Sequence, residues 1–360
     1  MTNHISTSTS KQRVRSFDFL RGIAILGVIS VHTIQNFPTN LGSFDFLMSQ
    51  GRFGVQLFYF ISAITMCYMW EQRKGEHRPI TNFYIRRFLR IAPLFWLAIP
   101  IYLYSNGLDA TYWAPEGIGV RQVLLTATFL HGFWPDSINS VVPGGWSIAL
   151  EMTFYVIFPY LILIFNNNKT YYLSTAFAIW VFNTFIFQNF LINFLSDHYQ
   201  TNSTTIVKDF LYLNFINQAP VFLLGCFAYF AFQTNIKRSD VIIFLTWLGT
   251  AIFAKYYFEK SGLGFLCIYI FIGLFVYYSV KKNIVLKPFE MLGRNSYSIY
   301  LAHFLVLSIL ADLLPYNKGV IAFFIGISLT TLLSYALSLL LYSLIEKKVH
   351  RLASSITRAK

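Results

Sequence analysis

The 360-residue chain has a composition that excludes an ordinary water-soluble globular protein. Hydrophobic residues make up 56% of the chain, charged residues only 12%, and the formal net charge is +13. So few polar side chains cannot coat a soluble protein of this size. Because the basic residues lie beside the ends of apolar runs, they indicate membrane topology, and no nucleic-acid partner is predicted.

The apolar residues fall in runs of about 20 residues, the length that a helix needs to cross roughly 30 Å of hydrocarbon. The predicted spans are 19–36, 52–69, 88–105, 146–165, 171–190, 210–232, 241–257, 263–280, 296–314 and 319–344. Because lipid offers the backbone no hydrogen-bond partner, the predicted fold is all-α, a polytopic transmembrane helical bundle of about ten spans. The shorter apolar stretch 121–134 predicts a re-entrant or interfacial helix.

The distribution of basic residues predicts the orientation of the bundle. With ten spans, most of the 28 Lys and Arg residues lie on the same side as the N-terminus. The positive-inside rule therefore predicts that both termini are cytoplasmic. We expect an N-terminal tail at 1–17, a transmembrane domain at 18–346 and a basic C-terminal tail at 347–360.

The cysteine pattern predicts neither a metal site nor a disulfide framework. Cys67, Cys226 and Cys267 all lie inside apolar segments without the spacing of metal ligands. We expect three buried free thiols.

Ionisable side chains inside spans are costly and are candidates for function. The first span contains Asp18, Arg21 and His32. Arg21 and His32 are eleven positions apart, which on a helix is about 20° of rotation and roughly 16 Å of rise, so they share one face. His32 is either a hydrogen-bonded interior histidine or a base that activates a hydroxyl nucleophile. Asp18 is positioned to pair with Arg21.

The third predicted span is preceded by the arginines Arg86, Arg87 and Arg90. Arg87 and Arg90 are neighbours on a helix and can clamp a phosphate group. The alternative is that all three are ordinary positive-inside anchors.

A third polar cluster lies at the start of the fourth span. Ser147 and Glu151 are one helical turn apart, and Trp146 precedes them. Glu151 either pairs structurally with an arginine at the membrane edge or acts on a substrate hydroxyl or a catalytic histidine. Trp146 either stacks on a sugar ring or belongs to an aromatic belt.

The fourth cluster lies in the ninth span, where Ser296 and His303 share a helix face with Tyr300 close by. His303 is either a second base or a histidine satisfied inside the protein core. No charged partner accompanies it at helical spacing.

Together these segments resemble the bacterial acyltransferase-3 family of membrane O-acyltransferases over most of the chain. Five elements of the family occur here in the family's order. The first is Arg21 and His32 with ten residues between them, and the second is 54–63 (GVQLFYFISA). The third consists of Arg87, Arg90, Ile91, Pro93 and Trp96, and the fourth of Trp146, Ser147, Glu151, Phe154 and Tyr155. The fifth is 292–303. The second element departs from the family pattern at Tyr59 and Ala63. A glutamate-plus-basic stretch at 346–351 resembles the family's ending.

The resemblance implies an acyltransferase in the bacterial inner membrane. Its expected acyl donor is cytoplasmic acetyl-CoA, and its expected acceptor is a hydroxyl of a cell-surface glycan or lipid-linked glycan, such as O-antigen, lipopolysaccharide or exopolysaccharide, on the outer side. The implied catalytic residues are His32, Glu151 and Asp18, and the implied donor-binding residues are Arg21, Arg87 and Arg90. The residues expected to bind the acceptor are Trp146, Ser147, Tyr300 and His303.

Two interpretations from other functional classes are also consistent with the residues alone. Charges in the membrane also mark transport pathways, so the chain could carry an acyl donor or a lipid-linked glycan without covalent chemistry. It could also be a structural or regulatory membrane subunit. The sequence carries no prediction of the oligomeric state.

Overall fold

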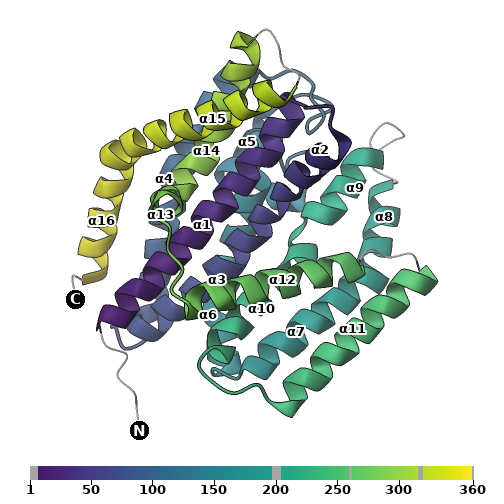
Figure 1. Cartoon of the computed structure of the whole chain (residues 1–360), viewed down its shortest axis with the longest axis vertical. Helices are drawn as coiled ribbons and strands as arrows, with labels where there is room; N and C mark the ends of the chain where they lie inside the picture. The colour runs from purple at the N-terminus through teal and green to yellow at the C-terminus, as the bar shows by residue number, and fades with distance from the viewer. Residues whose placement is uncertain (1–6, 197–203, 259–261, 315–318, 359–360) are drawn as a thin grey trace. The chain divides into compact units, whose positions relative to one another are not determined.

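The computed structural model describes residues 7–196, 204–258, 262–314 and 319–358, and these residues form helices and connecting loops without a strand (Figure 1). The helices are α1 (Thr7–Asn36), α2 (Gly42–Ser49), η1 (Gln50–Phe53), α3 (Gly54–Arg73), α4 (Pro79–Asn106), α5 (Val120–Ala127), η2 (Leu130–Phe133), α6 (Gly145–Phe165), α7 (Lys169–Phe182), η3 (Asn183–Phe187), α8 (Gln188–Ser196), α9 (Thr204–Leu213), α10 (Phe215–Ala231), α11 (Arg238–Phe258), α12 (Gly262–Lys281), α13 (Lys287–Arg294), α14 (Ser296–Leu313), α15 (Val320–Leu341), η5 (Tyr342–Glu346) and α16 (Lys347–Arg358).

The prediction of an all-helical bundle with ten spans is confirmed. Among the described residues, ten helical stretches are long and apolar enough to cross a membrane, from Arg15–Asn36 to Val320–Thr357. The stretch expected to be re-entrant or interfacial forms α5 and η2, which are both too short to cross.

Three helices extend further than the hydropathy pattern predicts. The described parts of both expected tails are helical, because α1 already begins at Thr7 and α16 follows η5 directly. The third spanning helix begins at Pro79, nine residues before the predicted start at position 88. Pro79 suits a first helical turn, where no backbone N–H is needed. The apolar signal marks the part of a helix that lies in lipid, while the helix itself continues into polar sequence.

The chain divides into two compact units, and the first comprises residues 1–61, 85–105 and 278–360. Within it, α1 contacts α2, α13, α14 and α15, and α14 packs along α15 (Figure 1). Phe37, just after α1, joins Val306, Leu307 and Leu310 of α14 in a buried apolar cluster. Helix α4 is tied to α14 by the Tyr102 hydroxyl, which donates to the carbonyl of Leu301. The helices α1 and α14 and residues 85–105 of α4, which carry most of the candidate residues, therefore belong to one unit.

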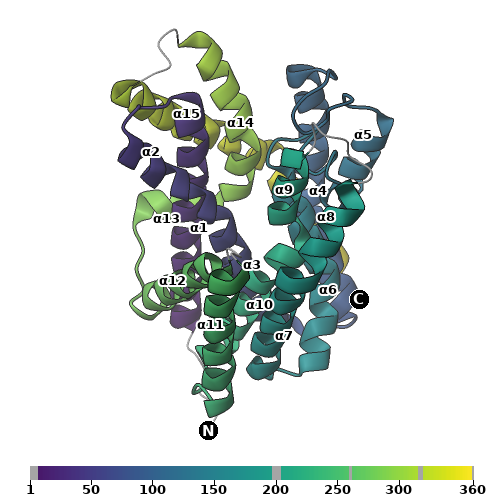
Figure 2. The same ribbon diagram turned by 90° about the vertical axis from the view of Figure 1, so that its right-hand side faces the viewer.

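The second unit comprises residues 62–84 and 106–277. In it, α7 lies beside α10 and α11 (Figures 1 and 2), and α6 contacts η2, α7 and α10. A buried ion pair of Lys169 and Asp240, 3.8 Å apart, joins α7 to α11. The Thr170 hydroxyl also donates to Asp240, at 2.6 Å. These bonds satisfy two charges that would otherwise be costly inside a helical bundle.

The cysteine prediction is confirmed for two residues and wrong for the third. Cys67 and Cys226 are buried free thiols, whereas Cys267 is free but exposed. Its helix, α12, is apolar around its circumference, so the sequence contains no signal that distinguishes a buried from an exposed face.

Candidate active site

His32 lies half-buried on α1, four residues before the end of the helix. Its Nδ1 contacts Oε1 of Gln35, one turn further along, at 2.9 Å. Because the amide oxygen only accepts, this contact assigns the ring proton to Nδ1 and leaves the lone pair on Nε2. The described residues give that Nε2 no hydrogen-bond partner. In this tautomer the lone pair of Nε2 is free to accept a proton.

A second imidazole lies beside His32. The ring centroids of His32 and His303 are 5.4 Å apart, and Phe304 contacts both rings, with centroids at 4.4 and 4.1 Å. His303 is fully buried, and its Nδ1 donates to the carbonyl of Tyr300 at 2.6 Å. Its Nε2 is buried without a hydrogen-bond partner in the described part of the chain. The ring of Tyr300 lies 5.6 Å from that of His303. Two bare imidazole nitrogens thus occur in one small region of the first unit.

Asp18 and Arg21 form the predicted ion pair, with Arg21 donating to Asp18 at 3.2 Å. Asp18 lies fourteen positions before His32 on α1, a separation of about 21 Å. It therefore cannot orient the His32 ring by a direct hydrogen bond, and Gln35 holds that place instead. Any other part for Asp18 in catalysis stays a prediction.

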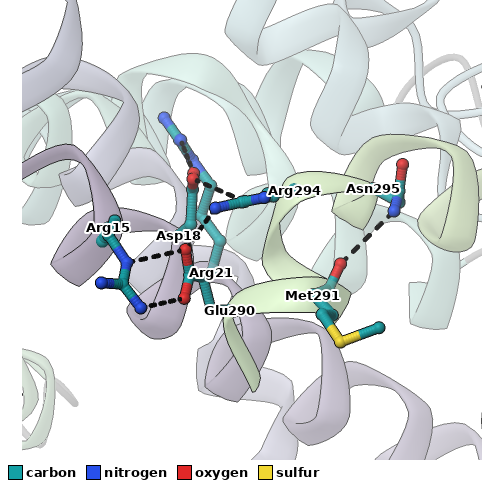
Figure 3. Close-up of polar contacts among 7 residues, drawn as sticks. All are labelled: Arg15, Asp18, Arg21, Glu290, Met291, Arg294 and Asn295. Atoms are coloured by element: carbon teal, nitrogen blue, oxygen red, sulfur yellow. Dashed lines mark hydrogen bonds and ion pairs between the residues drawn. The ribbon is translucent and has the colours of Figure 1, made fainter. Parts of the chain in front are cut away.

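Helix α13 adds two charged residues to this ion pair (Figure 3). Glu290 accepts a bidentate pair of bonds from Arg15, at 3.1 and 3.0 Å, and a further bond from Arg294. Arg294 also lies 3.8 Å from Asp18. Glu290 is buried, while the side chains of Arg15 and Arg294 are 46% and 59% exposed. The network therefore holds three guanidinium groups against two carboxylates, and two of its cations, Arg15 and Arg294, face solvent.

Two glycines allow α1 and α13 to approach closely enough for these ion pairs. A Cβ on Gly293 would lie 1.7 Å from the carbonyl oxygen of Asp18, and one on Gly22 would lie 1.9 Å from that of Phe289. No side chain fits at either distance. The spacing of the two backbones, and with it the contact between Arg294 and Asp18, therefore depends on glycine at both positions.

Glu290 should make the stability of the first unit depend on pH. The hydrogen-bonded Arg15 guanidinium, with help from Arg294, lowers the pKa of the Glu290 carboxyl below its ordinary value of 4.5. A lowered pKa stabilises the folded state above the ordinary value, and this contribution is lost as the pH falls through the folded-state pKa. We expect the thermal unfolding midpoint in detergent to fall between about pH 6 and pH 3 by a smaller amount in Glu290→Gln than in the wild type.

The control for this measurement is Asp109→Asn, which removes an exposed carboxylate. It should retain the pH dependence of the wild type. Equal pH dependence in Glu290→Gln and the wild type would contradict a stabilising role for the Glu290 charge.

Two of the three predicted donor-binding arginines, Arg87 and Arg90, lie on α4 within the first unit. Arg87 is buried and Arg90 is exposed. Arg90 acts electrostatically on Asp18 and on His350 of α16. Arg90 therefore lies within electrostatic range of the α1–α13 network.

Glu151 lies on α6, in the second unit. Its Oε1 accepts hydrogen bonds from the hydroxyls of Ser62, at 2.6 Å, and Tyr155, at 2.5 Å. The described residues give Oε2 no partner. Glu151 is half-buried, so this oxygen is not sealed inside the core. The structure thus replaces the expected arginine partner with two hydroxyls and leaves one carboxylate oxygen available to a ligand.

Trp146 and Ser147 lie at the start of the same helix. Ser147 is buried and donates to the carbonyl of Gly144 at 3.0 Å. Trp146 is partly buried and packs against an apolar cluster that includes Ile138 and Phe210. Their predicted contacts with an acceptor stay predictions.

Sequence reasoning missed five residues that the structure places in these clusters: Gln35, Ser62, Arg15, Glu290 and Arg294. Gln35 had a local signal, because it lies one turn after His32 on the same helix, and so had Glu290 and Arg294, which are four residues apart on α13. The described residues contain no group of three or more His, Cys, Asp or Glu side chains placed to hold a metal ion.

The model of the acyltransferase-3 family, described as an acyltransferase domain, matches residues 14–339. The chain belongs to this family. With its ten spanning helices it is a multi-pass membrane protein. No solved structure matches the chain.

Two curated relatives show what acyltransferase-3 proteins this chain is similar to. The peptidoglycan O-acetyltransferase OatA of Listeria monocytogenes is 24% identical over 355 residues, which cover 87% of this chain and 52% of the relative. The O-acetyltransferase OatA of Staphylococcus aureus is 23% identical over 331 residues, which cover 82% of this chain and 51% of the relative. The chain thus spans about half the length of these relatives.

Proposed function

We propose that this chain is an O-acyltransferase that moves an acyl group, acetyl in the first instance, from cytoplasmic acyl-CoA to a hydroxyl of a cell-surface glycan. The observation that carries the proposal is the contact of His32 Nδ1 with Gln35, which leaves Nε2 without a hydrogen-bond partner among the described residues. Membership of the acyltransferase-3 family supports the reaction class.

The reaction assigns one proton transfer to His32. Nε2 takes the proton of the acceptor hydroxyl while that oxygen attacks the thioester carbonyl. The carbon–sulfur bond breaks, the ester forms, and the thiolate leaves and takes up the proton from His32. In this proposal Arg87 and Arg90, with Arg21, hold the phosphates of the donor at the cytoplasmic face. Glu151 binds a hydroxyl of the acceptor through Oε2.

More than one kind of glycan is a candidate acceptor. The resemblance in the sequence suggests O-antigen, lipopolysaccharide or exopolysaccharide, while the name of the Listeria relative adds peptidoglycan. All of these present sugar hydroxyls at the outer side of the inner membrane, so the same chemistry serves each.

The test uses acetyl-CoA labelled in the acetyl group, given to membrane vesicles that contain the chain and an outer glycan. We expect covalent label on the glycan. A transporter would relocate the label without forming an ester, and a structural subunit would do neither, so either result would refute the proposal. Proton NMR of isolated peptidoglycan and of surface polysaccharide then identifies the acceptor by its O-acetyl signal.

The same assay tests the donor site. Arg87→Ala should raise KM for acetyl-CoA by about 10- to 100-fold, because a charge-assisted hydrogen bond is worth roughly 1.5–3 kcal/mol, and should change KM for the acceptor much less. The matched control is Arg52→Ala, which removes an exposed arginine of η1 in the same unit. Equal effects of Arg87→Ala on both KM values would contradict the assignment.

A further inference from the structure

A basic groove on the C-terminal helical segment is lined by none of the residues assigned above to catalysis or to binding of donor or acceptor. It has a volume of about 550 Å³ and is lined by Tyr342, Lys347, His350, Arg351, Ser354 and Ser355. All six residues belong to η5 and α16, which follow the spanning helix α15 without a break. The groove is therefore built by one short stretch of chain within the first unit.

The spacing of these residues explains why they line one groove. From Lys347 to Ser355 they recur at intervals of three and four, which places their side chains on one face of a helix. The sequence of α16, KKVHRLASSITR, contains no Asp or Glu. The lined face thus carries two permanent cations, an imidazole and three hydroxyls, and no carboxylate within α16 neutralises them.

The surroundings of the groove also favour an anion. The nearest acid along the chain, Glu346, accepts a hydrogen bond from Ser298 of α14 and is therefore engaged by another helix. Lys and Arg side chains together with hydroxyl donors are the groups that bind phosphate in proteins.

We propose that this groove on α16 binds a phosphate group at a site separate from the one assigned to Arg87. Two sources present that chemistry. One is the headgroup of an anionic phospholipid, since α16 continues directly from a span and exposes Leu352 and Ile356. The other is a phosphate of the nucleotide part of acyl-CoA. Only the second source depends on the proposed function.

The test is a binding measurement on the purified full-length chain in detergent, which needs no acyl transfer. The two probes are the phospholipid phosphatidylglycerol, compared with phosphatidylcholine by native mass spectrometry, and adenosine 3′,5′-bisphosphate, titrated by calorimetry. We expect Lys347→Gln and Arg351→Gln each to weaken the binding of one of the two probes by about tenfold or more. This is the size expected for the loss of one charge-assisted contact.

The matched control is Lys348→Gln, which removes the same charge at the neighbouring position, where the side chain does not line the groove. Lys348→Gln should weaken the binding of the same probe by less than about twofold. If the Lys347 and Arg351 variants bind phosphatidylglycerol more weakly, the site is assigned to a lipid headgroup. If they bind the bisphosphate more weakly, the site is assigned to a nucleotide.

Two results would overturn the proposal. The first is unchanged binding of both probes by the Lys347 and Arg351 variants. The second is an equal loss in Lys348→Gln, which would show that the charge of the helix acts diffusely without a site. Lys347, Lys348 and Arg351 are all exposed, and an unchanged thermal unfolding midpoint confirms that each variant is folded. Because binding is read directly, failure of this proposal is distinct from absence of acyl transfer.

Discussion

Replacing His32 by alanine is expected to lower the rate of acyl transfer by about 10²- to 10⁴-fold, the contribution of a positioned general base. His32 is the imidazole whose Nε2 is open and whose Nδ1 is held by Gln35. The measurement is transfer of labelled acetyl groups to glycan, normalised to the amount of chain in the membrane. Gln35→Leu should cause a smaller loss, because the ring remains but loses its orienting partner.

The matched control for His32→Ala is His77→Ala, which removes an exposed imidazole between α3 and α4. It should retain the activity of the wild type. Wild-type activity in His32→Ala would eliminate His32 as the base. An alternative role for His32 is to accept the acyl group itself, and it is tested separately, because an acyl-imidazole would appear as labelled protein when the acceptor is withheld.

Replacing Glu151 by glutamine is expected to reduce acyl transfer by about 10- to 100-fold, mainly through KM for the acceptor. The carboxylate accepts bonds from Ser62 and Tyr155 on one oxygen and offers the other to a ligand. Glutamine keeps the shape but replaces one acceptor oxygen by an amide donor. A hydrogen bond between a carboxylate and a substrate hydroxyl is worth roughly 1.5–3 kcal/mol, which sets the expected size of the loss.

Two partner variants and a control sharpen this prediction. Ser62→Ala and Tyr155→Phe each remove one donor to Oε1 and should cause smaller losses than Glu151→Gln, because Oε2 is retained. Glu116→Gln removes an exposed carboxylate of the same unit and should have no effect. If Glu151→Gln leaves KM for the acceptor unchanged, the assigned role of Oε2 is wrong.

Much of the fold was predictable from the sequence. The ten apolar runs give the ten spanning helices, because lipid allows a spanning backbone hardly any other hydrogen-bonded form. Helical spacing alone also gives the pairing of Asp18 with Arg21 and the single helix that carries Ser147 and Glu151. The true helix ends were not predictable, because hydropathy responds to the lipid-facing part of a helix and not to its polar continuation, as at Pro79 and at α16.

The candidate site was predictable only as a set of residues. Nothing near His303 in the sequence indicates that its ring lies beside His32, and nothing near Glu290 indicates Arg15. Both contacts join helices that are distant in the chain. They depend on how closely those helices pack, which Gly22 and Gly293 permit for α1 and α13.

The sequence by itself determined the class of protein, its spans and its family, since each follows from local hydropathy or from motifs within one helix. Only the tertiary structure decided which polar groups meet: Gln35 on His32, His303 beside it, Arg294 beside Asp18, and Ser62 on Glu151. The physical reason is that lipid dictates the secondary structure of each segment separately. The choice of partner helix depends instead on side-chain packing and hydrogen bonds between segments, which leave no local pattern in the sequence.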